Sequence, residues 1–182
     1  MSELEMRRST LMQSREAVDW ESIARGMVDG DTEFELTDFP VSSTRDYRFY
    51  QRVGLKSVVM DNAITSIGER CFAGCNNLES IVISSNLTSI GFGGFDQCYV
   101  LKNITIPSSV TSIAAYAFSN CRMLKYMIFE PTTPPTLAGT SAFIFTNNCP
   151  IYVPDSAVEA YKTAANWSSL ASRIFSINDL NT

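Results

Sequence analysis

Apolar and polar positions in the middle of this chain repeat with a fixed 23-residue period, the spacing that separates Leu55 from Leu78. A repeat of this length predicts a solenoid, in which each supersecondary unit stacks on the next and no unit buries its apolar face alone. The recurring positions are an opening leucine (Leu55, Leu78, Leu101, Leu124), an Ile/Leu/Val-Thr-Ser-Ile segment (64–67, 87–90, 110–113) and a phenylalanine followed three residues later by cysteine (Phe72, Phe95, Phe118).

Each unit opens with six residues whose first, fourth and sixth positions are apolar, as in Leu55, Val58 and Met60. Alternate side chains of an extended segment point to opposite faces, so the fourth and sixth should face the core and the third and fifth should face outward. Equivalent strands one period apart should pair in parallel as a narrow curved sheet. The return segment should turn Ile64 and Ile67 inward, and the phenylalanines should form a buried stack.

The 23-residue repeat continues toward the N-terminus, but its positions are less well matched there. Residues 32–54 form a degenerate first unit whose expected strand, with Phe34 and Leu36 inward, is shifted by one residue. Upstream, apolar residues between Trp20 and Val28 have helical spacing, with Asp19 available as N-cap. An amphipathic helix here would cover the open end of the solenoid. We therefore expect residues 1–31 to form an N-terminal arm and helical cap, and residues 32–150 to form the solenoid.

Beyond Leu124 the period breaks at a proline-rich turn, residues 130–135. A final strand is expected at 151–153, followed by a helix that Asp155 caps and that runs through Ala165. The residues expected to face inward from this helix and to complete a C-terminal cap over 151–182 are Val158, Tyr161, Ala165, Trp167, Leu170, Ile174 and Ile177. The whole chain is expected to be a single domain.

The composition is typical of an ordinary globular protein, and the net charge disfavours some classes of binding partner. The chain has 45% hydrophobic residues, 18% charged residues and a net charge of −5, which argues against a nucleic-acid binder because such proteins neutralise phosphates with basic residues. No apolar run approaches the roughly 18 residues of a membrane span, and residues 1–31 carry charges throughout, unlike a secretory signal. This favours a cytoplasmic protein or a virion assembled inside the cell, or a cell-surface protein if the chain is a mature form.

Catalytic and metal chemistry find little support in the sequence. The absence of histidine excludes Ser-His-Asp and Cys-His arrangements, and the glycines at 91–94 are attributed to backbone packing within a repeat. We expect no enzyme, no cofactor and no metal, although acidic residues between 29 and 38 leave a weak calcium contact open. Cys75, Cys98 and Cys121 share one repeat phase and are expected to be buried thiols. A disulfide between Cys75 and Cys98, or between Cys71 and Cys75, remains an alternative.

The motif LxxLxLPxxVTSIxxxAFxxC, recurring with this period, resembles the BspA-like, treponemal-type leucine-rich repeat of bacteria. The ending from Ile151 to Ile174 is similar to the C-terminal cap of bacterial members, and the resemblance covers about residues 32–177. It implies an α/β solenoid, namely a right-handed leucine-rich repeat with a parallel β-sheet, 23-residue repeats and helical caps. One departure is that Ala63, Asn86 and Ser109 stand where typical repeats have asparagine, so no asparagine ladder is expected.

The resemblance also implies a function. Modules of this family are non-catalytic recognition or adhesion proteins, often displayed on a cell surface, that bind proteins or glycans. Similar modules occur in gut phage and prophage genomes, so a structural or receptor-binding component of a phage particle is the alternative. The expected partner is thus a protein or a surface glycan, and homo-oligomer or virion assembly is possible.

The outward strand positions are the candidate partner-binding face. An apolar stripe flanked by polar groups is typical of a protein-contact surface, although β-branched residues also suit any sheet surface. The candidate residues are the fifth positions Val59, Val82, Thr105 and Ile128, the third positions Ser80, Asn103 and Tyr126, and the second positions Lys102 and Lys125.

The N-terminal segment is the candidate for assembly. Its apolar and basic residues could dock the solenoid onto a virion or a second copy, whereas a disordered tail is the default for such a segment. The residues assigned to this assembly arm are Leu4, Arg7, Arg8, Leu11 and Met12.

Overall fold

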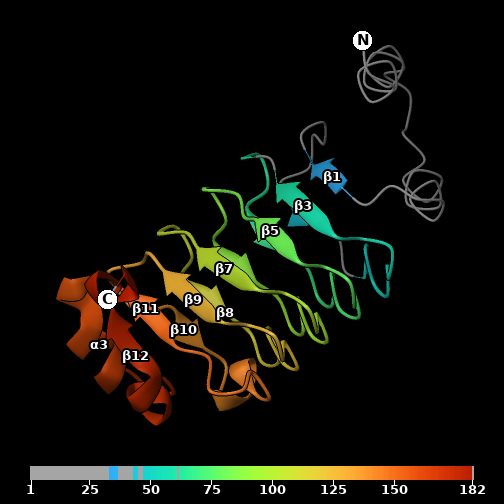
Figure 1. Cartoon of the computed structure of the whole chain (residues 1–182). Coiled ribbons are helices and arrows are strands. Elements are labelled where there is room, and N and C mark those ends of the chain that lie inside the picture. Colours follow the sequence, from blue (N-terminus) through green and yellow to red (C-terminus); the bar gives the residue numbers. More distant parts are fainter. Residues whose placement is uncertain (1–32, 37–42, 45–46, 61, 182) are drawn as a thin grey trace.

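The computed structural model describes residues 33–36, 43–44, 47–60 and 62–181 of the 182-residue chain. Each coil, meaning each turn of the solenoid, contributes one longer strand and, up to β10, one two-residue strand (Figure 1). The longer strands are β1 (Glu33–Leu36), β3 (Ser57–Met60), β5 (Ser80–Val82), β7 (Asn103–Ile106), β9 (Tyr126–Phe129), β11 (Ile151–Val153) and β12 (Ile174–Ser176). The short strands are β2 (Ser43–Thr44), β4 (Ser66–Ile67), β6 (Ser89–Ile90), β8 (Ser112–Ile113) and β10 (Thr136–Leu137).

The strand pairings within the described residues are all parallel, and they form three sheets. The longer strands lie in series along one side of the molecule, as β1-β3-β5 and β7-β9-β11-β12, and the short strands pair as β2-β4-β6-β8-β10 (Figure 1). The backbone N–H of Lys102 donates to the carbonyl of Glu79 over 3.2 Å and so joins the coils of β5 and β7. The predicted solenoid with a narrow parallel sheet is confirmed.

The register of these sheets reproduces the period of the sequence. Val58 lies opposite Ile81, and Ile90 lies opposite Ile113, in each case one full period along the chain. At both ends the offset is one residue longer than the period, since β1 pairs with β3 through Phe34 and Val58, and β9 pairs with β11 through Met127 and Ile151. The one-residue shift expected for the first unit is therefore present, and a matching shift follows the proline-rich turn.

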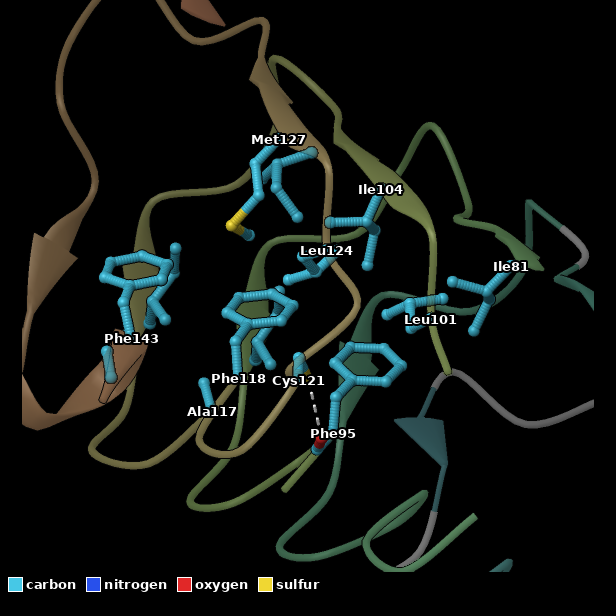
Figure 2. Packing of buried hydrophobic residues seen from close by; sticks show 14 of the residues in the cluster. Ile81, Phe95, Leu101, Ile104, Ala117, Phe118, Cys121, Leu124, Met127 and Phe143 are labelled. Carbon is cyan, nitrogen blue, oxygen red and sulfur yellow. Dashed lines mark hydrogen bonds between the residues drawn. The ribbon is translucent and has the colours of Figure 1, made fainter. Parts of the chain in front are cut away.

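A column of phenylalanine rings forms the centre of the core. Successive rings are stacked nearly parallel with centroids 5.0–5.7 Å apart and interplanar angles of 2–9°. Figure 2 shows part of this column, with Met127 and Ile104 of the long strands packed across from it. Every member is at most 2% exposed. The column comprises Phe49, Phe72, Phe95, Phe118 and Phe143.

Beside the rings runs a second column, formed by cysteines. The thiols of Cys75, Cys98 and Cys121 donate to backbone carbonyls of the preceding coil over 3.0–3.3 Å, as Cys121 does to Phe95 (Figure 2). All five cysteines of the chain are buried, and none of them is in a disulfide. The prediction of buried thiols is thus confirmed over the two disulfide alternatives.

Polar side chains also connect one coil to the next at the surface. Thr88 Oγ1 donates to the carbonyl of Thr65 over 2.9 Å. In the turns after the long strands, Asn86 Nδ2 donates to the carbonyl of Asn62 over 2.8 Å, and Ser109 Oγ donates to that of Ser85 over 2.8 Å. A mixed asparagine and serine ladder therefore stands where other leucine-rich repeats carry asparagine alone.

The turns that lead from each short strand to the next long strand bring backbones into close contact. A Cβ added to Gly91 would lie 2.8 Å from the carbonyl oxygen of Ile67 and the carbonyl carbon of Gly68. Contacts this short are essentially never seen for real side chains. Gly91 thus serves backbone packing, as predicted for the glycines at 91–94, whereas a Cβ at Gly93 or Gly94 would first meet side chains.

The C-terminal segment closes the last coil with side chains anchored on the proline-rich turn. Tyr161 OH donates to the carbonyl of Pro131 over 3.0 Å, and Trp167 Nε1 donates to that of Pro135 over 2.7 Å. Both side chains are at most 1% exposed. The helical pieces here are η2 (Thr140–Phe143), η3 (Asp155–Ala157), α3 (Val158–Thr163), η4 (Ser168–Arg173) and η5 (Ile177–Asn181).

The helix expected from Asp155 through Ala165 is wrong in its extent. Asp155 makes no capping bond and instead accepts a hydrogen bond from Ser176 Oγ over 2.8 Å. The helix ends at Thr163, and Ala165 is exposed while Ala164 packs against the core. The helix ends because Ala164 adopts an extended backbone (φ −66°, ψ 152°), and Asn166 then adopts a left-handed φ of 65° just before the buried Trp167.

Two N-terminal predictions lie outside the described residues. They are the amphipathic helix between Trp20 and Val28 and the assembly arm of Leu4, Arg7, Arg8, Leu11 and Met12. Both stay predictions.

Replacement of Gly91 by alanine should destabilise the fold more than replacement of Gly93. The Gly91 Cβ would meet backbone, which cannot move aside, whereas the Gly93 Cβ would lie 3.3 Å from the flexible Arg70 side chain at a φ of +58°. We expect Gly91→Ala to lower the free energy of unfolding by about 2–3 kcal/mol and Gly93→Ala by about 1 kcal/mol. Urea denaturation measures both, and equal losses would contradict the contact.

Alkaline conditions should unfold the protein through its buried thiols. Burial raises the pKa of Cys75 to about 12 and raises the pKa of Cys98 well above its ordinary value. Their stabilising contribution is therefore present below the unfolded thiol pKa of about 8.5 and is lost as the pH rises above it. Between pH 8.5 and 10.5, the free energy of unfolding of Cys98→Ala should fall less steeply with pH than that of the wild type. The two slopes should differ by about 1.4 kcal/mol per pH unit.

The matched control for this experiment is Leu101→Ala, which truncates a buried side chain of the same coil without removing a titratable group. It should be less stable than the wild type at every pH and fall with the same slope. Parallel slopes for all three proteins in urea titrations would refute the role of the thiol.

Candidate partner-binding face

The fifth strand positions form one continuous row on the outer surface of the sheets. The register sets Val59 beside Val82, and Thr105 beside Ile128. Val59 is 39% exposed and Val82 is 58% exposed, Thr105 is exposed, and Ile128 is half-buried. The apolar stripe predicted from the sequence thus faces outward along the long strands.

The row continues beyond the residues that the sequence singled out. Ile128 pairs with Tyr152 of β11, and Tyr152 pairs with Phe175 of β12. The rings of Tyr126 and Tyr152 lie 6.3 Å apart at 73°, and those of Tyr152 and Phe175 lie 6.0 Å apart at 41°. Tyr126, Tyr152 and Phe175 are here called the aromatic cluster, and Tyr152 and Phe175 are its members that the sequence did not single out.

Strand alternation could have found the aromatic cluster. Ile151 and Val153 are buried on either side of Tyr152, and Ile174 is buried next to Phe175. The sequence predicts a strand at 151–153 but places Ile174 in the C-terminal cap. The neighbouring Phe175 is therefore not predicted to lie in the sheet. Only the pairing of β12 with β11 sets Phe175 beside Tyr152.

The third and second positions border this row with polar groups. Ser80 and Asn103 are exposed, and Tyr126 is half-buried and contacts Tyr152 within the aromatic cluster. In the second positions Lys102 forms a salt bridge with Glu79, and both side chains are about half exposed. The hydrogen bond from Lys102 lowers the pKa of the Glu79 carboxyl. Lys125 is exposed and is in no ion pair among the described residues.

The side chains of this face offer packing surface and hydrogen-bonding groups. In the described part of the chain, no three His, Cys, Asp or Glu side chains gather into a group that could hold a metal. No helix there is both long and apolar enough to cross a bilayer. The rows supply aromatic surface, hydroxyl and amide groups and two lysines, which can pack against and hydrogen-bond a partner.

Parallel long strands on one side, short return strands and a leucine-lined core define a leucine-rich repeat solenoid. More specifically, the chain belongs to the BspA type leucine rich repeat family, whose model matches residues 42–172 in six copies. No curated protein matches the chain. Proteins of this class are generally non-catalytic.

Solved structures of bacterial proteins share the fold. A leucine rich cell surface protein from Faecalibacterium prausnitzii has a TM-score of 0.62 at 24% identity, over 80% of this chain and 36% of its own. The leucine rich repeat protein of T. pallidum has a TM-score of 0.62 at 26% identity, over 68% of this chain and 58% of its own. The pneumococcal vaccine antigen PcpA has a TM-score of 0.57 at 16% identity, over 81% and 40%. This chain thus spans between about a third and three fifths of those proteins.

Removal of the Lys102 charge should raise the pKa of Glu79. The Lys102 hydrogen bond is the largest cause of the lowered pKa, and the Lys56 charge adds a smaller effect. In Lys102→Met the Glu79 carboxyl should therefore titrate closer to its ordinary pKa, as followed by carboxyl ¹³C chemical shifts. Lys125→Met is the control and should leave the Glu79 titration unchanged. An unchanged curve in Lys102→Met would show that the pair does not persist in solution.

Proposed function

We propose that this protein is a non-catalytic recognition module that binds a protein partner through the outer face of its long strands, with the aromatic cluster as the main contact. The observation that carries the proposal is the row in which Ile128, Tyr152 and Phe175 are successive neighbours. Large aromatic side chains supply most of the binding energy in protein interfaces when they become buried. Phe175 is 41% exposed, so a partner can cover it.

The aromatic cluster distinguishes this face from an ordinary sheet surface. Val59 and Val82 are explained by the preference of β-branched residues for strands. Aromatic residues also favour strands, so the distinguishing feature is that three rings contact one another at one end of the row and remain partly exposed. Aromatic residues are enriched in interface cores, and polar groups such as those of Ser80 and Asn103 are typical of the rim.

The charges on the face indicate the chemistry of the partner. Lys56, Lys102 and Lys125 occupy second positions of three coils, with Glu79 as the acidic member of the row. The protein as a whole carries a net charge of −5. A partner with an acidic rim would therefore be attracted to this face and repelled by much of the remaining surface.

The description of the F. prausnitzii protein as a cell surface protein supports a similar location for this chain. A surface glycan is the alternative ligand for the same face. The role in a phage particle depends on the assembly arm at residues 1–31, which lies outside the described residues, and no observation on the solenoid favours it.

Truncation of the aromatic cluster should weaken partner binding without unfolding the solenoid. A partner can be identified by photo-crosslinking from a benzoylphenylalanine introduced at Val82, and its affinity can then be measured by calorimetry. We expect Phe175→Ala and Tyr152→Ala each to weaken binding about tenfold or more. Because both side chains are partly exposed, the melting temperature should fall by only a few degrees.

Tyr116→Ala is the matched control for these variants. Tyr116 is 42% exposed and lies on a turn outside the long strands, so its truncation should leave partner affinity unchanged. Equal affinities for the wild type, Phe175→Ala and Tyr152→Ala would refute the aromatic cluster as the main contact.

A further inference from the structure

A second surface with unusual chemistry lies on the turns that lead from each short strand into the next long strand. A hollow of about 280 Å³ opens there between successive coils. The residues that line it and carry the argument are Arg70, Phe92, Asp96, Tyr116, Asn120 and Phe145. None of them belongs to a strand, so the hollow is separate from the partner-binding face.

One coil lacks a side chain next to the hollow, at Gly93. Arg70, Gly93 and Tyr116 occupy the same repeat phase and share left-handed φ values of 49°, 58° and 60°. A Cβ added to Gly93 would lie 3.3 Å from Arg70 Cγ and 3.6 Å from Asp96 Cβ. A side chain at position 93 would therefore project between two of the lining residues and fill the space.

Aromatic rings form the apolar walls of the hollow. Phe92 is 36% exposed, Tyr116 is 42% exposed and Phe145 is 63% exposed. The rings of Phe92 and Tyr116 lie 5.4 Å apart at 61°, so their faces are not stacked on each other. The guanidinium of Arg70 lies 5.5 Å from the centre of the Phe92 ring, which orients that ring at the rim.

Polar groups of mixed character complete the lining. Asn120 Nδ2 donates to Asp96 Oδ1 over 3.3 Å and to Ser119 Oγ over 3.0 Å. A carboxylate has about four acceptor positions, and an amide both donates and accepts. Hydrogen-bonding capacity for a ligand therefore remains beside the aromatic walls. Arg70 and Asp96 carry opposite charges, which disfavours a ligand with a strong charge of either sign.

We propose that this hollow binds one ring of a neutral saccharide. A pyranose ring has an apolar C–H face that packs on an aromatic side chain, and its hydroxyl groups both donate and accept hydrogen bonds. Tyr116 and Phe145 supply the apolar contacts. Both amide protons of Asn120 are donated within the protein, so Asp96 and Asn120 Oδ1 supply acceptor positions for the sugar hydroxyl groups. The volume of about 280 Å³ lies just below the range of about 300–1,000 Å³ that holds drug-sized ligands, which suits a single sugar ring.

The probes are neutral and charged oligosaccharides of similar length. The neutral set is cellotetraose, mannotetraose, β-1,4-galactotetraose and chitotetraose, and the charged set is tetragalacturonate and the fully deacetylated chitosan tetramer. ¹H–¹⁵N spectra of the full chain are recorded during titration to about 10 mM of each. At least one neutral probe should bind with a dissociation constant of about 1 mM or tighter and shift amides of residues 92–97 and 115–121.

Three variants test the assignment of the hollow. Tyr116→Ala removes an aromatic wall, and Gly93→Asn fills the space with a residue that tolerates a left-handed φ. Asp96→Asn removes the acceptor charge with little change in volume. Each should weaken saccharide binding about tenfold, whereas Phe175→Ala, on the partner-binding face, should have no effect. Thermal melts show whether each variant is folded. If Gly93→Asn is unfolded, the saccharide affinity of Asp96→Asn decides whether the hollow is the binding site.

Several results would overturn the saccharide site. They are the absence of binding by every neutral probe, binding of a charged probe as tight as that of the neutral ones, and unchanged affinity in folded Tyr116→Ala and Asp96→Asn. Loss of binding in Phe175→Ala alone would place a glycan on the strand face instead. In the partner-binding experiment the roles are exchanged, since Phe175→Ala is the test variant and Tyr116→Ala is the control. Either proposal can therefore fail while the other stands.

Discussion

In-register stacking of equivalent residues underlies every other feature of this structure. Each coil hydrogen-bonds to the coil before it, and each buried side chain packs on its own counterpart one period away. Phe95 lies between Phe72 and Phe118 at nearly equal spacing, and the thiol of Cys98 reaches the carbonyl of Phe72. No coil has a core of its own, so stability comes from neighbour contacts. A residue that breaks the register is tolerated only at an end, as the longer offsets between β1 and β3 and between β9 and β11 show.

The same stacking produces both candidate binding surfaces. Because alternation buries every second strand residue, the remaining ones are presented outward in rows, and their identities are free to vary from coil to coil. On the long strands the row changes from valine to aromatic residues toward β12. On the turns, a hollow lies between coils next to Gly93, which lacks a side chain. The scaffold fixes the positions, and the recognition chemistry proposed for both surfaces comes from single substitutions within the repeat.

The parts that could be predicted are those repeated often enough to show a phase. The phenylalanine position occurs three times in phase, as Phe72, Phe95 and Phe118, which sufficed to predict a buried stack. In the structure Phe49 and Phe143 extend this stack at its two ends. The C-terminal segment occurs once, so its pattern had to be judged from local propensity. Alanines at 164 and 165 cannot be distinguished in that way, and the helix was extended too far. The helix ends just before the extended Ala164, and the next turn places Trp167 where its Nε1 donates to the carbonyl of Pro135.

The order of amino acids was sufficient to specify the solenoid, its period, the inward columns and the outward positions of the first four units, since stacking copies the local alternation of one unit onto the next. Three other features depend on the folded chain. The pairing of β12 with β11 brings Phe175 to Tyr152 and Tyr126. Successive coils gather residues from Arg70 to Phe145 around one hollow, and the C-terminal segment lies over the proline-rich turn. Each joins residues that follow no common period, and for these only the three-dimensional path of the chain specifies which groups meet.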